Sequence, residues 1–168
     1  EVGLFNPELR AATAFNPSSE HVEVTRAAGI TSVVSLPGSG GRRAASAGGI
    51  LITGQGALMH LDGWTWEEMA VKPGGVMDLL LSEVETAPRP GSGTRRRYKE
   101  GERQYEARLR ELSEFFEQAR RYQKAMAAGG ADFRRDLRLE AMIPVLEGLQ
   151  PLAIRAERER SIRDAVAF

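Results

Sequence analysis

Two charged residues interrupt apolar runs of this sequence. Asp78 lies inside "GGVMDLLLS" (74–82), and Arg155 closes the short apolar run of "PLAIRA" (151–156). A charge in such a run is costly unless it is paired or lies at a functional opening of the fold. The Arg155 guanidinium can hold a ligand carboxylate through two parallel hydrogen bonds, so Arg155 is a candidate substrate-binding residue. The Asp78 carboxylate could ligate a metal ion.

Other candidates for binding or chemistry lie in the first half of the chain. His60 lies on an apolar stretch, where a lone histidine is more often a hydrogen-bonded structural residue than a metal ligand. Gln55, in a predicted GQG turn, is a candidate substrate-binding residue, as are Gly38 and Gly40. These two glycines belong to a Gly/Ser-rich loop (37–49) that follows a predicted strand, where α/β proteins bind ligands. A flexible surface loop has the same composition, and the loop lacks the lysine spacing of a phosphate-binding loop.

A helix followed by a strand is predicted before this loop. Ser18 or Ser19 can cap the helix, and Gly29 suits the left-handed position that ends it. "ITSVVSL" (30–36) is β-branched and continuously apolar, which predicts a parallel strand buried on both faces. The helix residues expected to face inward are Val22, Val24 and Ala28.

The middle of the chain predicts strands and then a long helix. Residues 50–64 read as a short strand, the GQG turn and a second apolar run, and Thr65 and Glu68 fit a capping box. Residues 74–82 are a buried-strand candidate, and the Pro/Gly/Arg-rich segment 85–101 is interpreted as a flexible insertion or loop. A helix is expected over 102–128. Its predicted core stripe is Tyr105, Leu109, Leu112, Phe116, Ala119, Tyr122 and Met126.

Helix and strand signals continue to the C-terminus. Gly129 and Gly130 end the long helix, and Asp132 can cap a further helix that Pro144 must kink or restart. A strand at 151–156 then leads into a charged helix. Strands that alternate with helices predict parallel pairing with right-handed crossovers. The fold class is therefore α/β, and the pattern alone leaves an open doubly wound sheet and a closed barrel as alternatives.

Composition limits the classes of function. Lys plus Arg and Asp plus Glu each number 23, so charge gives no support for a nucleic-acid or membrane-surface partner. The sequence has no cysteine, which rules out disulfides and thiolate metal sites. It starts without Met and ends inside a helix pattern, so we expect an interior piece of a longer polypeptide. An upstream signal peptide would direct the protein to the periplasm or outside the cell, and without one it would be cytoplasmic.

Three segments resemble the amidohydrolase superfamily, and the imidazolonepropionase-like, often exported, bacterial proteins in particular. They are "FNPSSEHVEVTRAAGITSVVSLPGSGG", "GILITGQGALMHLDGWTWEEMAVKP" and "PVLEGLQPLAIRAERERSIRDAVAF". The resemblance implies that residues 1–168 form part of one (β/α)₈ TIM-type barrel domain. It also implies a metal-dependent hydrolase that acts on an amide-type C–N bond of a small molecule. The expected cofactor is a divalent metal, zinc above all, at the carboxyl ends of the strands.

The same resemblance places most metal ligands outside this sequence. An HxH pair would precede Glu1, and a histidine and an aspartate would follow Phe168. Arg155 stands where relatives have a histidine ligand, in "VHA", and an arginine has no lone pair for a metal. Asp78 stands where some relatives have a lysine at a binuclear centre. A rearranged site, a mononuclear site and a barrel without catalysis all fit these substitutions.

Three hypotheses for function follow. The first is an amidohydrolase-like hydrolase. The second is an inactive amidohydrolase-like barrel that binds a ligand or serves a structural role, in which Arg155 replaces a metal ligand. The third, from pattern alone, is a sugar- or nucleotide-binding α/β domain with the loop at 37–49 as its floor. A homo-oligomer is compatible with each of them.

Overall fold

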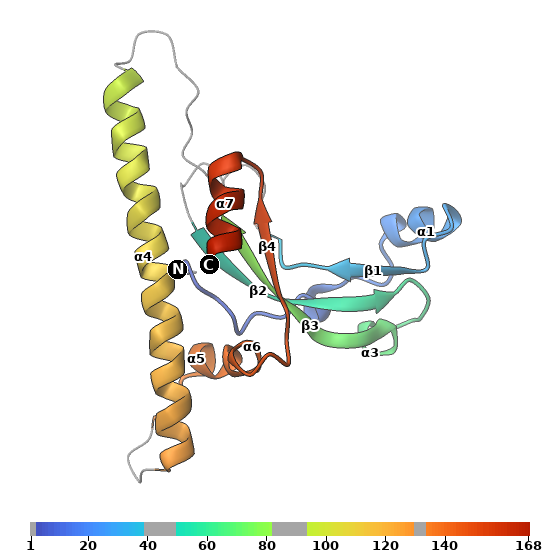
Figure 1. Cartoon of the computed structure of the whole chain (residues 1–168). Helices are drawn as coiled ribbons and strands as arrows, with labels where there is room; N and C mark the ends of the chain where they lie inside the picture. The colour runs from blue at the N-terminus through green and yellow to red at the C-terminus, as the bar shows by residue number, and fades with distance from the viewer. Residues whose placement is uncertain (1–2, 39–49, 82–93, 130–133) are drawn as a thin grey trace.

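The computed structural model describes residues 3–38, 50–81, 94–129 and 134–168, which form a curled four-stranded sheet and its helices (Figure 1). The longest helix lies along one side of the sheet. The elements are η1 (Ala12–Ala14), α1 (Glu20–Ala27), β1 (Ser32–Ser35), β2 (Ile50–His60), α3 (Trp66–Met69), β3 (Ala70–Leu81), α4 (Thr94–Ala128), α5 (Leu137–Ala141), α6 (Ile143–Leu146), β4 (Leu152–Ala156) and α7 (Glu159–Ala167).

The strands follow the order β1-β2-β3-β4, but only β3 and β4 run parallel. The pairs β1/β2 and β2/β3 are antiparallel, so the prediction of parallel pairing throughout was wrong for both. A parallel pair needs a crossover of about a dozen residues or more. The segment between β2 and β3 contains only the short helix α3, so the chain turns straight back, whereas α4, α5 and α6 provide a long crossover from β3 to β4.

The predicted GQG turn is instead the middle of β2. On this stretch Gln55 pairs with the N-terminal segment, accepting from the amide of Ala11 and donating to the carbonyl of Leu9, at 2.9 and 2.7 Å. A Cβ on Gly54, where φ is +133°, would lie 2.6 Å from the Leu9 carbonyl oxygen. The glycines therefore permit close packing of backbone on backbone and do not form a turn.

The helix and the strand predicted before the Gly/Ser-rich loop are more exposed than expected. In the described part of the chain β1 pairs only with β2, and Val34 is 56% exposed. Residue Val24 of α1 is also exposed, whereas Val22 packs against a small cluster formed by Ala12, Ala57, Met59 and Met69. β1 is therefore an edge strand rather than one buried on both faces. The terminating role of Gly29 is confirmed by its φ of +89°.

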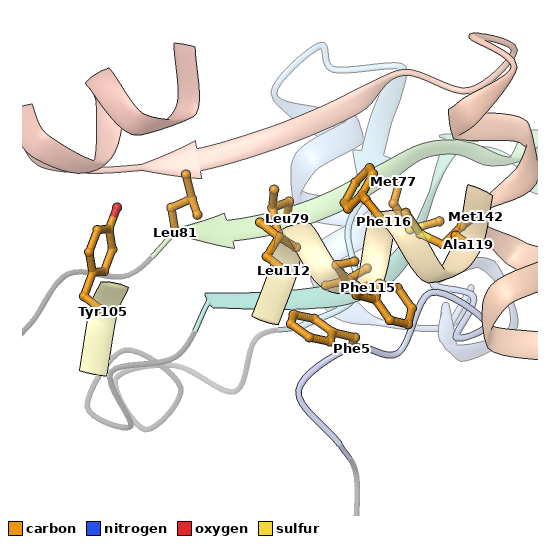
Figure 2. Close-up of a cluster of buried hydrophobic side chains, with 11 residues drawn as sticks. Phe5, Met77, Leu79, Leu81, Tyr105, Leu112, Phe115, Phe116, Ala119 and Met142 are labelled. Carbon is orange, nitrogen blue, oxygen red and sulfur yellow. The ribbon is translucent and has the colours of Figure 1, made fainter. Parts of the chain in front are cut away.

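The larger hydrophobic core lies between α4 and the sheet, and Figure 2 shows β3 facing the helix. Leu112, Phe115 and Phe116 of α4 lie in the same cluster as Met77 and Leu79 of β3. Burial confirms most of the predicted stripe, while Met126 is exposed. The rest of the buried cluster consists of Phe5, Ile52, Leu81, Tyr105, Ala119 and Met142.

Helix α4 starts earlier than predicted. It begins at Thr94, so the last part of the segment interpreted as a flexible connection is helical, and residues 85–93 lie outside the described ranges. Among the described residues, no helix combines the length and the apolar character needed to cross a membrane. The amphipathic pattern of α4 instead matches its packing on the sheet.

The C-terminal elements follow their local signals. Gly129 has a φ of +60° at the end of α4, and Pro144 lies in the first turn of α6. Asp132 lies outside the described residues, and α5 is capped by Asp136, whose carboxylate accepts from the amides of Arg138 and Leu139. Thr65 caps α3 as predicted, because its hydroxyl accepts from the amide of Glu68 at 3.3 Å.

Candidate functional site

Asp78 and Arg155, the two charged residues in apolar runs, lie on neighbouring parallel strands. In the β3/β4 register Asp78 is opposite Ala153, and Leu80 is opposite Arg155. Side chains alternate between faces along a strand, so Asp78 and Arg155 share the face opposite Met77, Leu79 and Ile154. Both lie toward the carboxyl ends of their strands, which is where parallel α/β folds place their sites.

The two side chains form a bidentate ion pair. Arg155 donates from Nε to Asp78 Oδ1 at 2.8 Å and from Nη2 to Asp78 Oδ2 at 2.5 Å. The Asp78 side chain is 0% exposed, whereas that of Arg155 is 39% exposed. The carboxylate is therefore enclosed, and the cation forms the outer part of the pair.

Thr53 of β2, the strand that pairs with β3 on the side away from β4, also contacts Asp78. Its hydroxyl donates to Asp78 Oδ2. Ile52 pairs with Leu79 and Gly54 with Asp78, which leaves Thr53 as the extra residue of a bulge in β2. Thr53 was not among the residues predicted from the sequence, although a glycine inside a strand, here Gly54, is a signal for such a bulge.

These contacts do not provide a metal site in the part of the chain that the structure describes. Arg155 has no lone pair to donate, and each Asp78 oxygen already accepts a hydrogen bond. No group of three or more His, Cys, Asp or Glu side chains converges among the described residues. The residues present at this position therefore do not fit a metal ion.

The other predicted metal candidate lies elsewhere. His60 is exposed at the last position of β2, where its Nδ1 is 2.8 Å from the hydroxyl of Ser32 on β1. Asp78 pairs with Gly54, in the middle of β2. The structure therefore does not bring His60 and Asp78 together.

The predicted substrate-binding residues that the structure describes do not lie together at one site. The Gln55 amide donates to the Pro7 carbonyl at 3.1 Å, and a Cβ at Gly74 would lie 2.7 Å from Gln55 Oε1. These contacts tie Gln55 to the N-terminal segment and to β3. Gly38 is exposed with open space around it, and Gly40 lies outside the described residues. Of the three candidates that the structure describes, Arg155 is the one that contacts Asp78.

The Arg155 guanidinium is held in place by the buried side of the site. A guanidinium is a permanent cation with five N–H donors, and Asp78 accepts from two of them. Thr53 and Asp78 fix its orientation from the buried side. The arrangement places an oriented positive charge toward the carboxyl ends of β3 and β4.

The protein has a mixed α/β fold with a partial barrel sheet. Its candidate site lies toward the carboxyl ends of two parallel strands. One solved structure, an amidohydrolase from Thermotoga maritima MSB8, is similar over 98% of this chain, with a TM-score of 0.74 and 23% sequence identity. The chain spans 40% of the length of that protein. At this identity the likeness shows the fold, in agreement with the partial barrel. No protein-family model and no curated protein matches the sequence.

Proposed function

We propose that this chain is part of an amidohydrolase-like hydrolase that acts on an amide-type C–N bond of a small molecule. The observation that carries this proposal is the fold likeness to the Thermotoga amidohydrolase, which extends over 98% of the chain. The segments that resemble imidazolonepropionase-like proteins support the same assignment and suggest the branch. Because the chain spans 40% of the neighbour, catalysis is a property of the longer protein in this proposal.

The contacts of Asp78 and Arg155 limit which residues could hold the metal of the proposed hydrolase. These two residues bind each other, so they are not metal ligands in the arrangement described here. The metal of the proposed hydrolase, with zinc as the expected ion, would be held by residues outside the described part of the chain. A site without these two positions has fewer protein ligands than a binuclear centre needs, so we expect one metal ion per polypeptide.

The metal content of the full-length polypeptide tests this proposal. We expect about one zinc ion per chain after purification, and loss of amide hydrolysis when the zinc is removed by a chelator. Elemental analysis and a panel of amide substrates give both readouts. Two zinc ions per chain would contradict the assignment of the Asp78 site, and hydrolysis that persists after complete metal removal would contradict the metal-dependent reaction.

A second candidate is a barrel that binds a ligand without hydrolysing it. The observation that favours it is the bidentate Asp78–Arg155 pair in place of ligand-type residues. This candidate predicts that the full-length protein binds no metal under any loading condition and hydrolyses none of the substrates. Zinc-dependent hydrolysis would eliminate it.

A further inference from the structure

We propose that two residues of α7, Arg160 and Asp164, hold the amino-terminal part of α4 in a latch that opens locally. The latch consists of their contacts with Glu102, Tyr105 and Glu106. When it opens, the turns of α4 before Tyr105 unfold, while the rest of the helix stays packed on the sheet. This inference goes beyond the proposed function, because it concerns a movement of the fold and does not depend on hydrolysis.

Arg160 contacts two acidic residues of α4 at once. Its Nη1 donates to Glu102 Oε1 at 2.9 Å, and its Nη2 donates to Glu106 Oε1 at 3.3 Å. The guanidinium carbon also lies 5.3 Å from the centre of the Tyr105 ring, which is within the range of a cation–π contact. One side chain of α7 therefore bridges a full turn of α4.

Tyr105 adds a second link between the two helices. Its hydroxyl donates to Asp164 Oδ2 at 2.9 Å, and its ring is buried in the larger core. Asp164 follows Arg160 by one helical turn, so both contacts with α4 come from one face of α7. The two helices are thus joined by ionic contacts and by a hydrogen bond to a carboxylate.

The support that the core gives to α4 changes at Tyr105. From this residue onward the helix contributes buried side chains to the larger core, among them Leu112 and Phe116. The residues directly before it, 101–104, are Gly, Glu, Arg and Gln and supply no apolar side chain. Gly101 is also a poor helix former. The amino-terminal part of α4 therefore depends on the latch more than the rest of the helix does.

The charges of α4 increase its dependence on Arg160. Glu102 and Glu106 are one helical turn apart, so their carboxylates lie on the same side of the helix and repel each other. Arg160 neutralises this repulsion while it joins both residues to α7. Loss of the guanidinium would remove two ion pairs between the helices and restore the repulsion within α4.

The latch lies at the same end of the sheet as the candidate site. Leu81, the last residue of β3, belongs to the same cluster as Tyr105, and Figure 2 shows Tyr105 next to the end of that strand. On the other helix, α7 begins at Glu159, shortly after β4 ends at Ala156. Opening of the latch would therefore change the surroundings of the carboxyl ends of β3 and β4.

Hydrogen–deuterium exchange of the full-length polypeptide, followed by mass spectrometry, tests the inference. Arg160→Gln is the key variant, because it removes the cation and keeps a polar side chain. Arg163→Gln is the matched control, since Arg163 pairs with Glu159 of the same helix at 2.6 Å. Both substitutions remove one positive charge from α7, and Arg160→Gln also removes the bridge to Glu102 and Glu106.

We expect Arg160→Gln to speed exchange in the part of α4 before Tyr105 by about fivefold, the size expected for the loss of two surface-type ion pairs. Exchange in residues 109–128 should remain as in the wild type. In Arg163→Gln both segments should exchange as in the wild type. Tyr105→Phe removes the hydrogen bond to Asp164, so it should also speed exchange in the amino-terminal part of α4.

The double substitution Glu102→Gln with Glu106→Gln removes both partners of Arg160 and their mutual repulsion. Arg160→Gln should therefore add little exchange in that background, and an undiminished increase there would overturn the latch. Unchanged exchange in Arg160→Gln, an equal increase in Arg163→Gln, or a uniform increase over the whole of α4 would overturn it as well. Metal content and amide hydrolysis are measured separately, so failure of the proposed function is distinguishable from failure of the latch.

Discussion

The two faces of β3 near its carboxyl end carry opposite chemistry. On one face Met77, Leu79 and Leu81 are buried against α4 and form part of the larger apolar core. On the other face Asp78 is equally buried, but it is enclosed by Arg155 and Thr53. Alternating side chains of a single short segment thus contribute to a hydrophobic core and to a polar network.

This difference separates what stabilises the fold from what supplies chemistry. Apolar burial on the helix face is non-directional and tolerates any side chain of suitable volume. The polar face requires specific partners, because a buried charge without one is strongly destabilising. A buried charge that depends on specific partners in this way marks the polar face of β3 as the candidate site.

The largest effect is expected on the helix face. Leu79→Ala should lower the free energy of unfolding by about 2–5 kcal/mol, because it removes buried methyl groups and leaves a cavity next to α4. Leu80→Ala is the matched control, since Leu80 is adjacent, partly exposed and on the opposite face. Urea unfolding measures both. Equal destabilisation by the two substitutions would contradict the division between the faces.

The next largest effect concerns the ion pair. Arg155→Met should cost about 2–3 kcal/mol, because it leaves the buried Asp78 carboxylate without its cation, although the partial exposure of Arg155 moderates the loss. Adding Asp78→Asn to Arg155→Met should restore most of the stability. A double-mutant cycle by urea unfolding measures the coupling. Additive effects would show that the two residues do not depend on each other.

Local signals predicted the elements around the site. The strand at 152–156, the end of α4 at Gly129 and the Thr65 cap depend on short-range periodicity and capping, and each is confirmed. The antiparallel course of β2 was not predicted, because its glycines were interpreted as a turn. Their actual role, close contact with Leu9 and Leu36, involves residues distant in sequence.

The site itself was only half predictable. The apolar surroundings of Asp78 and Arg155 indicated that each charge needed a partner, but not that the partner of each was the other, 77 residues away. Thr53 was missed because its contact depends on a bulge that shifts the β2/β3 register. Strand register is determined by tertiary packing, and a single sequence does not specify it directly.

A smaller effect is expected from the threonine that supports the pair. Thr53→Val keeps the shape and β-branching of the side chain but removes the donor to Asp78 Oδ2, so it should cost about 1 kcal/mol. The Asp78→Asn, Arg155→Gln background provides the control, because the hydroxyl should matter less once the carboxylate is absent. The same loss in both backgrounds would indicate that Thr53 acts through the bulge rather than through Asp78.

The smallest effect is expected at the Arg135–Glu140 ion pair. This pair tests whether burial determines how much Asp78–Arg155 contributes to stability. Arg135 donates from Nε and Nη2 to the two oxygens of Glu140, at 2.5 and 2.7 Å, but this pair is exposed to solvent. The hydrogen bonds from Arg135 lower the pKa of Glu140, against the opposing effect of desolvation. A lowered pKa in the folded state means that the carboxylate stabilises the fold above its unfolded pKa, and that this contribution disappears as pH falls through the folded value.

Glu140→Gln should therefore lower the unfolding free energy slightly near neutral pH, by less than Thr53→Val, and its difference from wild type should vanish as the pH falls through the acid range where carboxylates titrate. Urea unfolding over a pH series measures this difference, with Glu114→Gln on the exposed face of α4 as the control. Because an exposed pair is screened by water, the same bidentate geometry should contribute far less here than at Asp78. A loss as large as that of Arg155→Met would show that geometry, and not burial, determines the contribution of both pairs.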